Sequence, residues 1–345
     1  MNRQGIYIYG FVPSHCFEAI KSLLLESGIY AIEYGDVSAV VSDTRNEKLE
    51  YLDREALAHL LVDHQQKIER IMSGGCSAII PMQLGTIVSS GNDVIKILKN
   101  GFDILKKTFE VVSNVEEFDL VAVWNNFPDL IKTISETSTV RLMKEEIAKK
   151  NVYDQADSIS IGKLIKQKID EKNNRVHLDV VHSLMPYCLD VKKHETMNDE
   201  MPVNSAFLVK KENRDSFMVM IDQLDAKYAD QLNFKIVGPL PCYSFYTIEC
   251  KTLNKDEVEK AKAVLGIDAY KSDADLKRAY RLKAGLTHPD KNNEIAGDNN
   301  EGFIKINNAY KIMLDYSSII KKSPENISHE PLYLVKIKNA PNASI

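Results

Sequence analysis

A short stretch that begins at Ser272 constrains the local fold more than any other part of the chain. Ser272 and Asp275 have the spacing of a helix N-cap and its partner three residues later, and acidic residues in a first turn interact favourably with the helix dipole. Pro289 ends the helix, because a residue before proline is disfavoured in the α conformation. We therefore expect His288 to leave the helix and to lie beside Asp290 on an exposed turn.

The expected helix has an apolar side and a basic side. Residues at helical spacing can line a buried face: Leu276, Ala279, Tyr280, Ala284 and Thr287. Positive charges occupy the remainder of the surface: Lys277, Arg278, Arg281 and Lys283. A second helix is predicted near Asn300 by another apolar stripe: Phe303, Ile306, Ala309, Tyr310 and Met313. The two stripes predict a pair of antiparallel helices joined by a loop.

A basic helix followed by His-Pro-Asp and a second striped helix resembles the J domain, the module that recruits Hsp70 chaperones and stimulates their ATPase. The resemblance covers roughly residues 257 to 318 and rests on four motifs: Val264-Leu-Gly-Ile267, Ala279-Tyr-Arg281, His288-Pro-Asp-Lys-Asn292 and Phe303-x-x-Ile306-x-x-Ala309-Tyr310. Lys283 stands where J domains usually bury a leucine. The resemblance implies an Hsp70-binding surface made of His288, Pro289, Asp290, Lys277, Arg278, Arg281 and Lys291.

The composition favours an intracellular globular protein. A chain of 345 residues with 44% hydrophobic and 27% charged residues has room for two or three domains. A net charge of -5 argues against bulk electrostatic binding of nucleic acid. The 5 cysteines form no C-x-x-C pair and fit a reducing cytosol. No apolar run approaches membrane-spanning length. We expect a cytoplasmic protein with no nucleic-acid partner and no membrane partner.

The first part of the chain predicts an α+β domain over residues 1–127. A strand over residues 5–11 and a helix from Ser14 to about Glu26 precede two strands, Ile29–Tyr34 and Val37–Ser42, which a Gly35-Asp36 turn joins as a hairpin. Helices are expected over Asp53–Met72 and Asp93–Val112, with a kinked pair of strands over 78–88 between them, and a strand over Phe118–Trp124 completes the domain. The first of these helices has an apolar face: Leu57, Leu60, Leu61, His64, Ile68, Ile71 and Met72.

The second part predicts another α+β domain over residues 128–254. Pro128 and the polar Thr133–Thr139 stretch mark its start. Two helices, around Val140–Ile147 and Ile161–Ile169, can pair as an arm. A helix around Phe217–Tyr228 and four strands follow: Ser183–Lys192, Ser205–Lys211, Phe234–Leu240 and Tyr243–Lys251. The J domain then covers 255–320, and a tail over 321–345 contains a possible strand, Leu332–Ile337.

The body of the chain resembles the gas vesicle F/L family over about residues 5 to 251. The motifs that carry this resemblance are Tyr7-x-Tyr-Gly10, Ile80-Pro-Met-Gln-Leu-Gly-Thr86, Ala206-Phe-Leu-Val209 and Gly238-Pro-Leu-Pro-Cys-Tyr-Ser-Phe245. The resemblance implies two α+β domains, of which the second is ferredoxin-like. It also implies an accessory role in gas vesicle nucleation, with contact to the small hydrophobic shell protein and to other accessory proteins.

Chemistry of its own is not expected in this chain. It has no Walker loop and no H-E-x-x-H motif, and the pair His59/His64 is five residues apart, one more than a zinc-binding helical pair needs. We expect no catalytic residue, no metal site and no cofactor, and hence no enzyme. Our leading hypothesis is a vesicle-associated assembly protein that binds shell protein and brings Hsp70 to it. The alternative is a structural minor component of the vesicle with a degenerate J domain.

Overall fold

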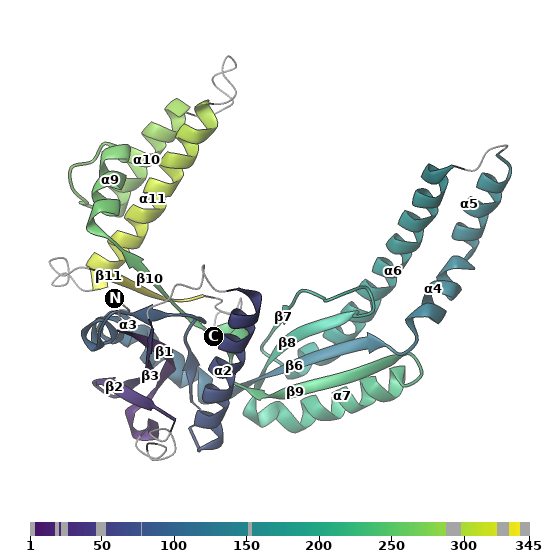
Figure 1. The fold of residues 1–345 in the computed structure, drawn as a ribbon, viewed down its shortest axis with the longest axis horizontal. Helices are drawn as coiled ribbons and strands as arrows, with labels where there is room; N and C mark the ends of the chain where they lie inside the picture. The colour runs from purple at the N-terminus through teal and green to yellow at the C-terminus, as the bar shows by residue number, and fades with distance from the viewer. Residues whose placement is uncertain are drawn as a thin grey trace. The chain divides into compact units, whose positions relative to one another are not determined.

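The structure, a computed structural model, describes residues 4–17, 21, 27–45, 53–76, 78–150, 154–287, 298–322 and 331–338. The chain divides into two compact units. The first unit combines Met1–Glu110 with Thr247–Lys338, and the second holds Val111–Tyr246. The C-terminal helices therefore share a unit with the N-terminal sheet, although the two are far apart in the sequence (Figure 1).

The first unit contains a five-stranded sheet built around its first strand. Its strands are β1 (Gln4–Pro13), β2 (Ile29–Tyr34), β3 (Val37–Arg45), β4 (Ile80–Pro81) and β5 (Ile87–Val88). β3 and then β2 follow β1 on one side, while β4 and β5 pair with its other edge. The predicted hairpin is confirmed, because β2 and β3 pair antiparallel around a turn at Gly35, which has a φ of 62°. The helix expected from Ser14 to Glu26 is described only at residues 14–17 and 21, which are helical.

Two helices of the first unit, α2 (Arg54–Ser73) and α3 (Gly91–Val112), lie where the sequence predicted helices. Asp53 caps α2 by accepting a hydrogen bond from the Ala56 N–H at 2.8 Å. The apolar face expected for α2 is buried only in its second half, at His64, Ile68 and Ile71. Leu57 is 40% exposed and Leu61 is 51% exposed, so the first half of this face does not pack against the sheet.

The second unit has the ferredoxin-like topology that the resemblance implied. Its antiparallel strands lie in the order β7-β8-β6-β9. They are β6 (Val115–Trp124), β7 (Asp190–Lys193), β8 (Val203–Lys210) and β9 (Leu232–Leu240). The helices are α4 (Phe127–Ser135), α5 (Ser138–Ala148), α6 (Gln155–Leu184), α7 (Arg214–Tyr228) and α8 (Tyr243–Tyr246). As predicted, α5 packs on α6, and the pair extends from the sheet as an arm in Figure 1.

Three details differ from the sequence-based expectation. β6 does not complete the N-terminal sheet but is a central strand of the second one, because its partners are β8 and β9. Pro128 lies in the first turn of α4, which Asn126 caps, and does not mark a domain boundary. The expected strand Ser183–Lys192 begins only at Asp190, since α6 continues to Leu184.

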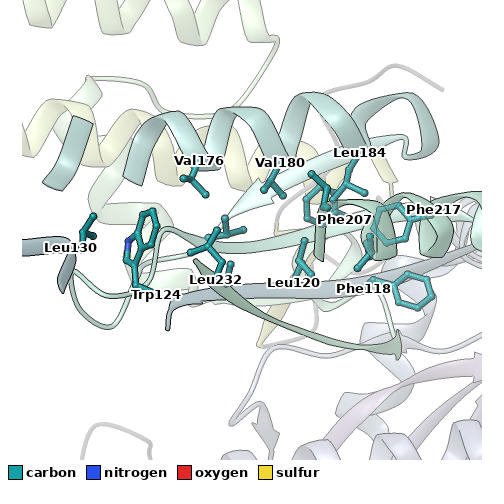
Figure 2. Packing of buried hydrophobic residues seen from close by; sticks show 14 of the residues in the cluster. Phe118, Leu120, Trp124, Leu130, Val176, Val180, Leu184, Phe207, Phe217 and Leu232 are labelled. Carbon is teal, nitrogen blue, oxygen red and sulfur yellow. The ribbon is translucent and has the colours of Figure 1, made fainter. Parts of the chain in front are cut away.

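The core of the second unit lies between one face of its sheet and the helices α4, α6 and α7. Figure 2 shows Val176, Val180 and Leu184 of α6 pointing toward the strands. Phe207 and Phe217 meet with ring centroids 5.6 Å apart. The side chains of β6 that enter this core, including Leu120 and Trp124, alternate along the strand, as expected for a sheet covered by helices on one face. The pairing with β8 and β9 places β6 in the second unit.

The C-terminal helices, which we call the J module, are α9 (Lys255–Leu265), α10 (Asp273–Thr287) and α11 (Asp298–Lys322). They enclose a small core of Val258, Ala261, Leu265, Leu276, Ile306, Ala309 and Met313. The predicted stripe of the second helix is confirmed at its three buried residues, Ile306, Ala309 and Met313. Before and after the module run β10 (Ile248–Leu253) and β11 (Leu332–Ile337). These two strands pair antiparallel with each other, so the expected strand Tyr243–Lys251 is replaced by α8 and β10.

Candidate functional site

Helix α10 begins as its sequence predicts. The Asp275 N–H donates to Ser272 Oγ at 3.1 Å, and the Ser272 hydroxyl donates to the Asp275 carboxylate at 2.7 Å. Asp273, also in the first turn, accepts from the Tyr270 hydroxyl at 2.6 Å and pairs with Lys321 of α11. The acidic first turn therefore both caps α10 and ties it to its neighbours.

The buried side of α10 fixes how the helix faces its partner helix α11. Leu276 is buried in the core of the module. The Tyr280 ring stacks on the Tyr310 ring with centroids 4.3 Å apart, and its hydroxyl donates to Asn307 Oδ1 at 2.7 Å. A side chain held by packing, stacking and a hydrogen bond cannot rotate freely, so the opposite side of α10 is presented in one orientation.

That opposite side is exposed and positively charged. We call Lys277, Arg278 and Arg281 the cationic face, and all three are exposed as the sequence predicted. Arg278 pairs with Asp275 at 2.6 Å, whereas no ion pair of Lys277 or Arg281 is found within the described residues. Surface cations of this kind raise association rates with an acidic partner more than they stabilise the fold.

The two side chains that follow Arg281 differ from the cationic face. Leu282 follows Arg281 directly and is 68% exposed, so an apolar side chain lies within the cationic face. Lys283, which stands where a leucine is usual, is half-buried. A Cβ at Gly266 would lie 3.3 Å from Lys283 Cε, so the aliphatic stem of this lysine runs along the end of α9. The stem fills the place of an apolar side chain.

The loop after α10 lies outside the described residues. It contains four of the predicted site residues, His288, Pro289, Asp290 and Lys291. Their assignment to Hsp70 binding stays a prediction. The described parts on either side, α10 and the start of α11, are the elements that the motif was expected to join.

The J module is anchored at both ends by paired strands, a feature that the sequence suggested only as a possible strand near the C-terminus. Asp315 of α11 accepts from Lys251 of β10 at 2.6 Å and from Lys336 of β11 at 3.5 Å. A separate apolar cluster joins the base of α11 to the two strands and consists of Leu253, Ile319, Leu332 and Leu334. The base of α11 is therefore bound to both strands by charge and by apolar packing.

The paired strands are in turn attached to the rest of the first unit. The Asn100 side chain of α3 donates to the Tyr333 carbonyl at 2.9 Å. A Cβ at Gly101 would lie 2.8 Å from Val335 Cγ1, so the glycine permits a close approach of β11 to α3. The Gln83 N–H donates to the Ile248 carbonyl at 2.8 Å. Contacts through α3 and through the β4 region attach the strands that flank the J module to this unit.

The family motifs near the N-terminus form a buried hydrogen-bonded group. The Gly85 N–H donates to the Tyr7 hydroxyl at 3.1 Å, and this hydroxyl is bonded to His64 Nδ1 at 2.9 Å. Burial lowers the pKa of His64 to about 4, so the imidazole is neutral and the hydrogen bond joins two uncharged side chains. A Cβ at Gly10 would lie 2.7 Å from the Ile80 carbonyl oxygen, which explains glycine at this position. These residues hold the loop after β4 against β1.

The family motif Gly238–Phe245 lies just before β10 and is held by the buried carboxyl group of Glu117. The Ser244 N–H and hydroxyl donate to the two oxygens of Glu117 at 2.9 and 2.7 Å, and His194 Nε2 lies 3.2 Å from the same hydroxyl oxygen. Lys192 donates to the Ser244 carbonyl at 2.8 Å. These hydrogen bonds fasten the bend at Ser244 to β6 and β7.

Glu117 was missed in the sequence analysis. Burial raises its pKa to about 8, although the hydrogen bonds from Ser244 oppose this rise. The sequence carried little signal for this, because Glu117 has charged neighbours, Glu116 and Asp119, in the same strand. Within the described residues, no cluster of three His, Cys, Asp or Glu side chains could hold a metal ion.

The fold of the body and the cationic face of α10 together define a class of protein, an α+β body of the gas vesicle F/L type that carries a J domain. The family model of the gas vesicle synthesis proteins GvpL/GvpF matches residues 5–247, and the DnaJ domain model matches residues 263–319. The chain therefore belongs to the GvpL/GvpF family of gas vesicle synthesis proteins, and it has a C-terminal DnaJ domain.

Individual relatives agree with this assignment. Gas vesicle protein F of Nostoc sp. is 22% identical over 246 residues, which are 71% of this chain and 98% of the relative. The protein of the same name from Haloferax mediterranei is 19% identical over 246 residues, 71% of this chain and 94% of the relative. The crystal structure of GvpF from Anabaena sp. matches with a TM-score of 0.57 and 20% identity over 71% of this chain and 99% of that one. GvpF from Microcystis aeruginosa gives a TM-score of 0.55 with 21% identity over 70% and 99%.

The match to the gas vesicle family model ends at residue 247, before the J module begins at Lys255. Among the described residues, no helix is both long enough and apolar enough to cross a membrane.

Proposed function

We propose that this chain is a gas vesicle assembly protein that binds the vesicle shell protein and recruits an Hsp70 chaperone through its J domain. In this proposal the chain is not an enzyme, and ATP hydrolysis belongs to the Hsp70. The protein acts in the cytoplasm and at the growing vesicle. The observation that carries the proposal is that one chain combines the GvpL/GvpF body with a DnaJ domain.

The way the J module is mounted supports this proposal. A J domain on a long flexible linker can act at many distances from a client. Here β10 and β11 pair over six residues each, and Asp315 and the cluster around Leu334 bind α11 to them. An Hsp70 bound to the module is therefore held near the first unit, where a client on that unit can be handed over.

The exposed surface of α10 supports the Hsp70 part of the proposal. Lys277 and Arg281 project from a helix whose other side is locked by Tyr280 and Leu276. Positive charge on a fixed scaffold suits an acidic docking surface, which would be met at a high rate and in one orientation. The His288–Asp290 motif would then trigger ATP hydrolysis by the bound chaperone.

The test is the stimulation of an Hsp70 from a gas-vesicle-forming cell, measured as its single-turnover rate of ATP hydrolysis. We expect His288→Gln to abolish stimulation, and Arg281→Glu to raise the half-maximal concentration by roughly tenfold, which corresponds to ~1.4 kcal/mol. Lys260→Glu makes the same charge change at an exposed position of α9 and is the matched control. Full stimulation by His288→Gln would remove the Hsp70 part of the proposal.

The client part needs a separate experiment. Shell protein is diluted from denaturant into solution with the full chain, with Hsp70 and ATP, or with both, and its aggregation is followed by light scattering. We expect suppression to require both, and to be lost with His288→Gln. Retention of the chain in fixed proportion on salt-washed vesicles, together with no effect in this assay, would favour a structural component of the vesicle instead.

A further inference from the structure

The second unit contains an open groove of approximately 550 Å³ between α4, α6 and the end of α7. Its floor is apolar, with Ile134 of α4 and Val176 of α6 buried beneath it. Thr133 and Thr137 are exposed at its edge. Figure 2 shows Val176 near the end of the core where Trp124 lies. Binding pockets in proteins usually have volumes of ~300–1,000 Å³, so this groove has the size of a site.

One wall of the groove is a stripe of positive charge. Lys168, Lys172 and Arg175 recur along α6 at the spacing of one helix face. The groove also contains two carboxylates, but both are already paired within the protein. Glu171 accepts from Lys168 at 2.8 Å, and Asp179 accepts from Lys227 at 2.6 Å and from Tyr228 at 2.7 Å.

Two cations in this wall, Lys172 and Arg175, take part in neither of these ion pairs. Lys172 lies over the Trp124 ring, with its Nζ 5.3 Å from the ring centroid, and Arg175 forms no ion pair within the described residues. The Trp124 indole N–H donates to Asn173 Oδ1 at 2.7 Å, which fixes the ring on which Lys172 rests. The lysine is held in place before any ligand arrives, which lowers the entropy cost of using it.

We propose that this groove is a docking site for an acidic amphipathic helix of a partner protein. An apolar side chain of the partner would lie on Ile134 and Val176, and two of its carboxylates, one helical turn apart, would pair with Lys172 and Arg175. The groove lies wholly in the second unit and uses no residue of the J module, so the inference does not depend on Hsp70 recruitment.

The chemistry of the groove favours a peptide over a small anion. A phosphate or carboxylate ion alone would leave the apolar floor in contact with water and would gain only surface-exposed ion pairs, which contribute ~0–1 kcal/mol each. A helix in a groove gains apolar contact and charge pairing together. Cβ atoms three residues apart on a helix are ~5–6 Å apart, so Lys172 and Arg175 match carboxylates with the same spacing on a partner helix.

The test uses the full chain and two fluorescently labelled helical peptides of equal length. One carries glutamate and leucine on a single face, and the other has lysine in place of each glutamate. Binding is followed by fluorescence anisotropy. We expect the acidic peptide to bind, the basic peptide not to bind, and the double variant Lys172→Glu/Arg175→Glu to weaken binding by at least about tenfold. Lys163→Glu, an exposed position of α6 outside the groove, is the matched control and should change affinity less than about twofold.

A second variant guards against loss of folding. Gln231 lines the groove and is exposed, so Gln231→Glu adds a negative charge without disturbing the core, and we expect it to weaken binding several-fold. The proposal is overturned if the acidic peptide fails to bind the unaltered chain, if both peptides bind equally, or if Lys163→Glu has the effect of the double variant. Inorganic phosphate that binds as tightly as the peptide would show a small-anion site and would also overturn it.

Discussion

The family motifs of the body place their characteristic residues in internal contacts, whereas the J module places its characteristic basic residues on the surface. In the body, Tyr7 and Ser244 are bonded to other parts of the same unit, to His64 and to Glu117. On α10, the three residues of the cationic face are exposed, and of these three only Arg278 has an ion pair within the described residues. The family motifs of the body therefore specify its architecture, whereas those of the J module specify a surface.

This difference indicates where to look for function in the body. A motif whose polar groups form internal hydrogen bonds has no donor or acceptor left to bind a partner protein. The surfaces available to a partner are those that the motifs do not mark, such as the α4–α6 groove and the exposed first half of α2. Stability measurements can test the comparison directly, because a buried motif and an exposed surface respond very differently to substitution.

The largest loss of stability is expected for Gly238→Ala. Gly238 has a φ of 153°, which disfavours a side chain, and an added Cβ would lie 2.5 Å from the Phe118 ring and 2.9 Å from the Glu117 carbonyl oxygen. Backbone strain and overpacking together should cost about 4 kcal/mol of unfolding free energy. Trp124 is the only tryptophan and lies in the second unit, so its fluorescence during urea unfolding reports on this unit.

Gly162→Ala is the matched control for that experiment. Gly162 lies inside α6 with nothing within 4 Å of an added Cβ. Alanine is the better helix former, so this variant should gain about 0.5–1 kcal/mol. Equal effects of the two substitutions would contradict the structural role given to the Gly238–Phe245 motif.

The next largest effect is expected at Glu117, and it depends on pH. Glu117→Ala leaves the Ser244 N–H without its acceptor in a buried place and should cost about 3 kcal/mol. The pKa of Glu117 is raised by burial to about 8 in the folded protein, above its ordinary value of 4.5. The contribution of Glu117 to the unfolding free energy is therefore fully present below pH 4.5 and is lost as the pH rises through about 8.

Glu117→Gln removes the ionisable group at this position and keeps a carbonyl oxygen that can accept a hydrogen bond, so it tests the charge apart from the hydrogen bonds. Glutamine cannot ionise, so the variant should lose stability less steeply than the unaltered chain between about pH 5 and pH 9. Asp119 and Lys192 act on the carboxyl in opposite directions and are present in both proteins. Urea unfolding across this range measures the slope, and an unchanged slope would mean that another group titrates.

A smaller and more local effect is expected at the base of the J module. Leu334→Ala removes a side chain from the cluster that joins α11 to β10 and β11, at a cost of about 2 kcal/mol. Amide hydrogens near Ile319 should then exchange faster, while those near Leu265 in the α9–α10 core stay protected. Lys338→Ala, at an exposed position just after β11, should leave both regions unchanged. Uniformly faster exchange would show that the module has no separate anchor.

Local patterns predicted most elements of both units, but not which strands would pair. The Gly35-Asp36 turn, the helices α2 and α3 and the apolar stripe of α11 follow from neighbouring residues. β6 and β10 were assigned to the wrong sheets because the partners of a strand lie far away in the sequence and leave no local signal. The cationic face was predictable from helical spacing, since exposure follows from the position of the buried stripe.

Burial of charge was harder to predict than exposure of charge. The strand β6 has two adjacent glutamates, and the sequence alone does not distinguish Glu116, which pairs with Arg214, from Glu117, which is enclosed with Ser244. The groove on α6 was also missed, because its lysines resemble the solvated face of an ordinary helix. Only the arrangement of α4 and α7 around them creates a site.

The smallest effect on stability is expected for Arg281→Glu. Arg281 is exposed and has no ion pair within the described residues, so its replacement should change the unfolding free energy by less than about 0.5 kcal/mol. Leu276→Ala, five residues earlier on the buried side of the helix, should instead cost about 3 kcal/mol. Thermal unfolding followed by circular dichroism compares the two. A loss above about 1 kcal/mol for Arg281→Glu would mean that this arginine supports the fold, and the contrast between buried body motifs and an exposed J-module surface would no longer hold.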